Sequence, residues 1–252
     1  MQASVKIMDI DVDMISNDIL IKEINEYLTD EKPQVILFAS TELLNQAVGD
    51  ESCRKLIGMA DLLLPGEEAL LSAHHADVLK AGDMVVSCKS FGLVLEKLTK
   101  EDRSIYIVSK SDNDVYLLKE YCKRMQPELR IVGSCVYTED LDDAAIVNEI
   151  NSHVPDILLV DLKTGAQEKW IMAHVPLLNA RLCIGIGGVA GLVMAQEKEI
   201  PGWIVKLHLD GLYHKIVREQ SVKKDMRARI FRKKVVQYNN QIDEQNQKDD
   251  TK

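Results

Sequence analysis

Short apolar runs alternate along this chain with segments of helical pattern, and this alternation constrains the fold more than any other feature. The runs are rich in Val, Ile and Leu and mostly apolar throughout, as strands buried on both faces are. They are Val5 to Ile10, Val35 to Ala39, Leu62 to Leu64, Ile105 to Val108, Arg130 to Gly133, Ile157 to Val160 and Leu182 to Ile184. We predict that these runs are the strands of an α/β fold.

Helical patterns fill the intervals between the runs. They cover Asn17 to Leu28, Thr41 to Val48, Glu67 to His74, Phe91 to Leu98, Asp112 to Met125, Leu141 to Ser152 and Gln167 to Val175. Helix-start signals precede three of them, namely Ser16, Ser111 and the pair Glu139-Asp140. Strands that alternate with helices predict a Rossmann-like, mostly parallel sheet with helices on both faces.

The size and composition fit one core in a protein of the cytoplasm. The 252 residues are 46% hydrophobic, but no apolar stretch approaches the roughly 20 residues that span a bilayer. The first residues also lack the pattern of a secretion signal. The five cysteines are odd in number and form no CxxC pair, so we expect reduced, mostly buried thiols.

A basic segment follows this α/β pattern. Ten Lys or Arg and three Asp or Glu lie between Trp203 and Lys234, although the whole chain has a net charge of -9. The segment reads as helices only, and Val222, Met226 and Ile230 form its clearest apolar stripe. We therefore predict an α/β domain over 1–202, a basic helical C-terminal appendage over 203–238 and a disordered tail over 239–252.

Two interpretations of the basic segment 203–234 stay open. A basic amphipathic helix binds an anionic membrane surface, and a helix packed on the body with a solvated basic face has the same pattern. Nucleic acid is not expected as a partner, because no recognition motif accompanies the charge and aromatic residues are sparse.

Two short motifs suggest a phosphate or nucleotide site. Gly185 to Ala190 fits G-x-G-x-x-A, in which glycines let the backbone approach a phosphate; a tight turn without ligand explains it equally well. Gln167 and Glu168 have the hydrogen-bonding groups to receive a ribose or a base edge, but they also suit the start of a helix. A nicotinamide site is disfavoured, because no acidic residue ends a strand about 20 residues later.

Other catalytic signatures are missing from the sequence. There is no G-x-S-x-G elbow, H-E-x-x-H pair or Walker loop. His74 and His75 are adjacent on a predicted helix, where their side chains point about 100° apart, so they are not expected to share a metal ion.

The order of these pieces resembles the WecG/TagA/CpsF glycosyltransferase family over residues 4–216. The stretches that carry the resemblance are VKIMDIDVD, VILFASTELLNQA, ADLLLPGEEAL, RIVGSCVYTED, PDILLVDLKTGAQEKWI and LCIGIGGVAGLVMAQEKEIPGWIVKLHLDGLY. Its most specific parts are QEKW, the Gly-x-Gly-Gly turn, and Pro-x-Trp followed by Lys-Leu-x-Leu.

The resemblance implies an activity. Such enzymes transfer N-acetylmannosamine or a related sugar from a UDP donor to a polyprenyl-diphosphate-linked acceptor, with inversion, without a metal and without another cofactor. Their basic appendage touches the membrane, which implies a peripheral location on its inner face, and family members often self-associate. The implied substrate-binding residues are Ser40, Gln167, Glu168, Gly187 and Gly188, and Glu67 is the candidate general base.

The departures from the family pattern fall where chemistry is expected. Gly66 stands where the family has its suspected catalytic Asp, and Met84 and Glu199 replace two arginines. Val108-Ser109 replaces a Gly-Gly loop. Because each lost donor to a leaving diphosphate typically costs about 100-fold or more, these changes predict weakened catalysis unless Lys89 or Lys163 compensates.

Two main hypotheses follow. The first is a glycosyltransferase of cell-surface polysaccharide assembly. The second is a catalytically inactive relative that binds a UDP-sugar or supports an active glycosyltransferase as a partner subunit. A nicotinamide-dependent oxidoreductase is a distant third.

Overall fold

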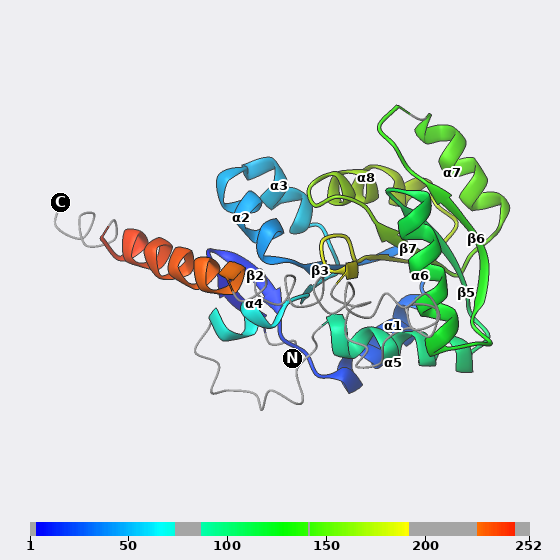
Figure 1. Ribbon diagram of the computed structural model, residues 1–252, viewed down its shortest axis with the longest axis horizontal. Helices are drawn as coiled ribbons and strands as arrows, with labels where there is room; N and C mark the ends of the chain where they lie inside the picture. The colour runs from blue at the N-terminus through cyan, green and yellow to red at the C-terminus, as the bar shows by residue number, and fades with distance from the viewer. Residues whose placement is uncertain (1–3, 74–86, 141, 192–225, 245–252) are drawn as a thin grey trace, which may run out of the picture.

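A six-stranded parallel sheet forms the centre of the protein in the computed structural model, which describes residues 4–73, 87–140, 142–191 and 226–244 (Figure 1). The strand order is β4-β3-β8-β7-β5-β6. The strands are β3 (Gln34–Ala39), β4 (Leu62–Pro65), β5 (Ser104–Ser109), β6 (Arg130–Val136), β7 (Ile157–Asp161) and β8 (Leu182–Gly185). The predicted Rossmann-like α/β class is therefore confirmed.

Helices connect these strands and cover both faces of the sheet. They are α1 (Asn17–Thr29), α2 (Thr41–Gly49), α3 (Glu51–Ile57), α4 (Glu68–Ala73), α5 (Ser87–Lys100), α6 (Asp112–Met125), α7 (Asp143–Ser152) and α8 (Ala166–His174), with a 3-10 turn, η1 (Val175–Leu177). Buried residues of α2, α3, α7 and α8 join one hydrophobic cluster, and those of α1, α5 and α6 join the other.

The central strands supply side chains to both clusters, because successive residues of a strand point to opposite faces. In β3, Val35 and Leu37 pack in the cluster with α2 and α8, whereas Ile36 and Phe38 pack in the cluster with α1 and α5. This two-sided burial explains why the sequence of the strand is continuously apolar.

The first apolar run is a hairpin and not a strand of the main sheet, contrary to prediction. Strand β1 (Ser4–Ile7) pairs antiparallel with β2 (Ile10–Asp13). Between them Met8 and Asp9 have φ angles of 51° and 61°, which reverse the chain as a two-residue hairpin turn does. The hairpin packs beside β4, where the Asp13 carboxylate accepts a hydrogen bond of 2.9 Å from the Leu63 backbone N–H.

Local signals explain where most helices begin. Ser16 and Ser111 accept hydrogen bonds from the first turns of α1 and α6, as predicted. Helix α7 begins later than predicted, because Asp142 caps it in place of Glu139-Asp140. The sequence reading missed α3, which begins at its own cap, Asp50.

A helix over residues 226–244 lies against the hairpin side of the molecule, and its C-terminal end projects away from the body (Figure 1). Phe231 and Val235 are buried in the core, whereas Met226 and Ile230 are 57% and 50% exposed. The stripe through Met226 and Ile230 therefore does not face the core. The residues four apart that face the core begin at Phe231.

The same helix runs six residues into the segment for which composition predicts disorder, and it ends at residue 244. Phe231 and Val235 pack in the core, and Tyr238, one turn further, packs partly buried against it. This tertiary packing stabilises the helix although the sequence is polar. The predicted boundary at 202, the helix from Trp203 and the end of the tail lie outside the described residues.

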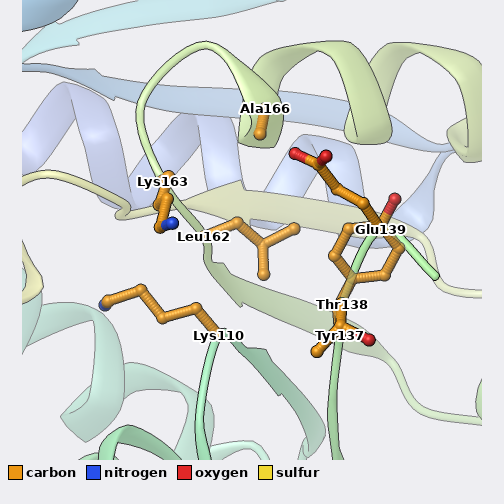
Figure 2. A pocket seen from close by; sticks show the side chains of 7 residues that line it. All are labelled: Lys110, Tyr137, Thr138, Glu139, Leu162, Lys163 and Ala166. Carbon is orange, nitrogen blue, oxygen red and sulfur yellow. The ribbon is translucent and has the colours of Figure 1, made fainter. Parts of the chain in front are cut away.

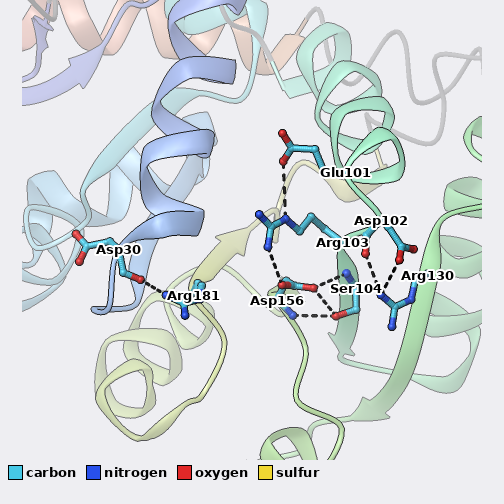
Figure 3. A network of polar contacts seen from close by, with 8 residues as sticks. All are labelled: Asp30, Glu101, Asp102, Arg103, Ser104, Arg130, Asp156 and Arg181. Atoms are coloured by element: carbon cyan, nitrogen blue, oxygen red, sulfur yellow. Dashed lines mark hydrogen bonds and ion pairs between the residues drawn. The ribbon is translucent and has the colours of Figure 1, made fainter.

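Polar contacts join the amino ends of the strands (Figure 3). The carboxylate of Asp156, just before β7, accepts hydrogen bonds from the Ser104 backbone N–H at 2.8 Å and from the Ser104 hydroxyl at 2.7 Å. It also pairs with Arg103 at 3.2 Å. Arg130 pairs with Asp102 beside it, and Arg181 donates to the Asp30 carbonyl. This end of the sheet is thus closed by internal bonds.

Candidate functional site

Three adjoining cavities follow the carboxyl ends of the strands, the edge where open α/β sheets bind ligands. The α2 cavity, of about 430 Å³, is lined by residues that include Ser40, Glu67, Gly188, Arg227 and Phe231. The middle cavity, of about 400 Å³, is lined among others by Glu42, Lys110, Asp161, Lys163, Thr164 and Gly188. The Tyr137 cavity, of about 270 Å³, is lined by residues that include Lys110, Tyr137, Glu139, Leu162 and Lys163.

The cavities share residues and therefore form a continuous row. Glu42 and Gly188 line both the α2 cavity and the middle cavity. Lys110, Leu162 and Lys163 line both the middle cavity and the Tyr137 cavity. Such a row can receive an elongated ligand with several chemical parts.

Glu67 contributes a carboxylate to the α2 cavity. Its Oε1 accepts hydrogen bonds from the Thr41 backbone N–H at 2.9 Å and from the Thr41 hydroxyl at 3.3 Å. Thr41 is the first residue of α2, where a negative charge is favoured by the helix dipole. Ser40, the N-cap of α2, lines the same cavity and accepts a hydrogen bond from Leu43 N–H at 3.1 Å.

Gly66 could not be replaced by a larger residue without a local shift. A Cβ atom at this position would lie 2.6 Å from the Ala39 carbonyl oxygen and 2.7 Å from Val189 Cγ1. The backbone N–H of Gly66 also donates to Ala39 O at 2.8 Å. The carboxylate that follows β4 in this cavity belongs to Glu67, one residue later.

Gly187 and Gly188 form a turn after β8 that contacts the neighbouring loops. A Cβ atom on Gly187 would lie 2.1 Å from the Leu162 carbonyl oxygen. Gly188 has a φ of 81°, and a Cβ there would lie 2.8 Å from Thr164 Oγ1 and 3.2 Å from Ser40 Oγ. Glycine is thus required at both positions, and Gly188 brings Ser40 and Thr164 to the same place.

Gln167 and Glu168 are buried, with 0% and 1% of their surface exposed. Gln167 Oε1 accepts a hydrogen bond of 2.6 Å from the Gly187 backbone N–H, and its amide donates to Glu168 Oε1 at 2.9 Å. Glu168 Oε2 accepts from Gly165 N–H at 2.6 Å at the start of α8. Burial raises the pKa of Glu168, and these hydrogen bonds only partly oppose it.

These bonds tie the turn before α8 to the turn after β8. The prediction that Gln167 and Glu168 contact a nucleotide stays a prediction. Their polar groups have protein partners, and any ligand bond would be added to these or exchanged for them.

Lys110 and Asp161 form an ion pair at the carboxyl ends of β5 and β7. Lys110 Nζ lies 3.2 Å from both carboxylate oxygens of Asp161, which also accepts from the Ser109 hydroxyl at 3.0 Å. Asp161 is 1% exposed. Burial raises the pKa of this carboxyl group, and Lys110 opposes the shift.

Tyr137 forms one side of its cavity, facing the two lysines across Leu162 (Figure 2). Its ring packs at 58° against Trp170, with 5.7 Å between the centroids. Asp143 accepts a hydrogen bond of 3.1 Å from Trp170 Nε1 and lies 3.4 Å from His174 Nε2. The aromatic side of the cavity is therefore held in place from behind.

The structure brings Ser40, Glu67 and Gly188 together in the α2 cavity and places Lys163 with Gly188 in the middle cavity. Gly187, Gln167 and Glu168 line none of the three cavities. Lys110 and Tyr137 were missed from the sequence. Each directly follows a strand, β5 or β6, that extends beyond its predicted run. Met84, Glu199, His74 and His75 and the side chain of Lys89 lie outside the described part of the structure.

A family of known proteins matches almost the whole of this arrangement. Residues 5–224 match the model of the "Glycosyl transferase WecG/TagA/CpsF family". The chain belongs to this family. The resemblance seen in the sequence is thereby confirmed, and the WecG/TagA/CpsF match covers the sheet and the cavities except for the wall that residues 226–244 give to the α2 cavity.

Two proteins similar to this WecG/TagA/CpsF chain come from Staphylococcus aureus. A protein of strain NCTC 8325 is 19% identical over 242 residues, and one of strain MRSA252 is 20% identical over 243 residues. Each alignment covers 95% of this chain and 95% of the relative. Both relatives are named N-acetylglucosaminyldiphosphoundecaprenol N-acetyl-beta-D-mannosaminyltransferase.

No helix within the described ranges is long and apolar enough to cross a membrane.

Proposed function

We propose that this protein transfers an N-acetylhexosamine-type sugar, N-acetylmannosamine or a relative, from UDP to a polyprenyl-diphosphate-linked acceptor in cell-surface polysaccharide synthesis. Family membership supports sugar transfer. The names of the staphylococcal relatives support the choice of sugar and acceptor. No metal or other cofactor is part of the proposal.

The observation that carries the proposal is the Glu67 carboxylate in the α2 cavity. This cavity adjoins the middle cavity at Gly188. In the proposed reaction Glu67 takes the proton of the acceptor hydroxyl, whose oxygen attacks the anomeric carbon of the donor sugar. The bond from that carbon to the diphosphate oxygen breaks, and UDP leaves with the electron pair. A general base of this kind contributes typically about 100-fold or more to the rate.

The donor would lie along the row of cavities. Its sugar would face Glu67 near Ser40 and Gly188, and its nucleotide would extend toward the turn held by Gln167 and Glu168. The glycine turn lets a ligand approach the backbone closely, which supports this orientation.

A second function is favoured by a specific feature of the same site. Glu67 is already bonded to the N–H and hydroxyl of Thr41, and Gly66 leaves no room for an acidic side chain of its own. A carboxylate held in this way stabilises the start of α2 even if it takes no proton. The alternative is therefore an inactive relative that binds a UDP-sugar or supports an active glycosyltransferase.

The deciding experiment is a transfer assay with UDP-N-acetylmannosamine and an N-acetylglucosaminyl-diphosphate-polyprenol acceptor. We expect turnover by the unchanged chain and a loss of roughly 100-fold or more in kcat for Glu67→Gln. Glu51→Gln is the matched control, because Glu51 is an exposed carboxylate of α3 that pairs with Lys55.

The outcomes separate the two functions. Equal kcat in Glu67→Gln and the unchanged chain would remove Glu67 as the base. Saturable binding of the UDP-sugar in a calorimetric titration, with no turnover on any acceptor, would favour the inactive relative.

A further inference from the structure

Two lysines approach the middle cavity from neighbouring strands. Lys110 follows the last residue of β5, and Lys163 lies two residues beyond β7. The two strands pair in parallel with Ser109 opposite Asp161, so both lysines leave the sheet on adjacent strands about 4.8 Å apart. Figure 2 shows the two side chains on the same side of the Tyr137 cavity.

Lys110 is held in this place by buried and partly buried carboxylates. The Asp161 carboxylate lies 3.2 Å from the Lys110 ammonium nitrogen, and the Asp114 carboxylate lies 3.5 Å from the same nitrogen. Ser109 in turn fixes the Asp161 carboxylate. Because an ammonium group has three N–H donors, Lys110 can keep its bond to Asp161 and still donate into the cavity.

Lys163 differs from Lys110 in having no internal partner. Within the described ranges no residue forms a hydrogen bond or an ion pair with its ammonium group, and the residue is exposed. Glu42 and Asp161 also line the middle cavity, so the lining is not uniformly basic. The cavity therefore offers two localised cations beside a glycine turn rather than a broad positive surface.

We infer that Lys110 and Lys163 bind the diphosphate group of the sugar nucleotide in the middle cavity, with Asp161 as the residue that positions Lys110. This inference takes the sugar nucleotide as ligand from the proposed function. That the group bound here is a diphosphate is inferred from the two lysines themselves. Lysines bind phosphate as point charges, and two of them on adjacent strands match two adjacent phosphates. The leaving diphosphate is then stabilised by Lys163, which the sequence offered as a compensating charge, and by Lys110, which the sequence did not assign to it.

The test measures binding of three probes, UDP, uridine and inorganic pyrophosphate, by calorimetry on the full chain. Lys110→Gln and Lys163→Gln each remove one charge. We expect each to weaken UDP and pyrophosphate roughly tenfold or more, the effect of one lost charge-assisted bond, and to leave uridine binding unchanged. Lys169→Gln is the matched control, since Lys169 is an exposed lysine of α8 that lines none of the three cavities.

Each result decides one of the two ideas. UDP binding that is equal in both lysine variants and the unchanged chain overturns the inference and leaves the proposed function standing. Lysine-dependent binding of pyrophosphate without a preference for UDP supports the inference and counts against the proposed function. Loss of uridine binding equal to that of UDP overturns the inference, because the lysines would then shape the pocket and not bind phosphate. Failure of the unchanged chain to bind UDP or pyrophosphate overturns both.

Discussion

Two aspartates at opposite ends of strand β7 have pKa values shifted in opposite directions. Burial opposes ionisation of both. At Asp156 the hydrogen bonds from Ser104 and the charge of Arg103 outweigh burial and lower the pKa. At Asp161 burial dominates over Lys110 and Ser109 and raises it. The contacts at the amino end of the strand therefore favour the ionised form of Asp156. At the carboxyl end, burial opposes ionisation of Asp161.

Asp156→Asn should destabilise the protein in a pH-dependent way. The folded state lowers the pKa of Asp156, so its stabilisation is present above the ordinary Asp pKa of about 3.9 and is lost as pH falls through the folded value. We expect the free energy of unfolding to drop by about 1 to 3 kcal/mol at pH 7 and by less at pH 3. Urea unfolding at both pH values measures this.

Asp102→Asn is the control for this variant. Its carboxylate pairs with Arg130, but 81% of the side chain is exposed, and exposed pairs contribute little. An effect of Asp156→Asn that is equally large at pH 3 would contradict the ionic explanation.

At the scale of elements, the sequence predicted the parallel strands and most helices because their signals are local. Continuous apolar runs located β3, β4, β5, β7 and β8, and a serine cap located α6 at its observed bounds. The hairpin was missed, because a run interrupted by Lys6 and Asp9 was read as one strand. The sequence also did not show that the last helix meets the core through Phe231 and Val235, because the face that packs depends on tertiary contacts.

The site was predicted only where a motif marks it. Ser40, Glu67 and Gly188 could be proposed from the sequence, because the family motifs contain these positions. Lys110 and Tyr137 could not, since their role depends on which strands are neighbours. That order, with β7 between β5 and β8, is set by packing and not by local pattern.

Phe231→Ala should loosen the helix over residues 226–244. Phe231 is 1% exposed and is one of two fully packed contacts of this helix with the core. Removing a buried aromatic ring costs about 3 kcal/mol or more. We expect amide hydrogen exchange within 226–244 to accelerate roughly 100-fold, which mass spectrometry can measure.

Ile230→Ala tests the same helix one residue away. Ile230 is 50% exposed, so its loss should change exchange by less than about tenfold. Equal acceleration in both variants would mean that the helix is held by something other than the Phe231 contact.

At the scale of the whole molecule, the two ends of the sheet differ in chemistry. Internal ion pairs close the amino end (Figure 3), whereas the carboxyl end carries the three cavities. The helix over 226–244 meets the α2 cavity through Arg227 and Phe231 and then leaves the body (Figure 1). Its exposed basic residues thus lie beside the cavity that contains Glu67.

Binding to anionic vesicles should depend on this helix. Arg229 and Lys233 are exposed and four residues apart, so they lie on one face. We expect the double variant Arg229→Gln with Lys233→Gln to bind vesicles of anionic lipid roughly 30-fold more weakly, at about 1 kcal/mol for each charge. Sedimentation with vesicles at low and physiological salt measures the effect, since salt screens such charges.

A double variant of Lys55 and Lys169 to Gln removes the same charge from elsewhere on the surface and is the control. Equal binding to neutral vesicles, or equal loss in the control, would contradict an electrostatic role for this helix.

The place of Arg227, Ile230 and Phe231 in the wall of the α2 cavity has a practical consequence for shortening the chain. A chain shortened before residue 226 to improve solubility would lose part of its cavity wall together with its basic surface. Inactivity of such a truncated chain would therefore not distinguish a lost membrane contact from a damaged α2 cavity, whereas point substitutions on the exposed face of the helix keep the two apart.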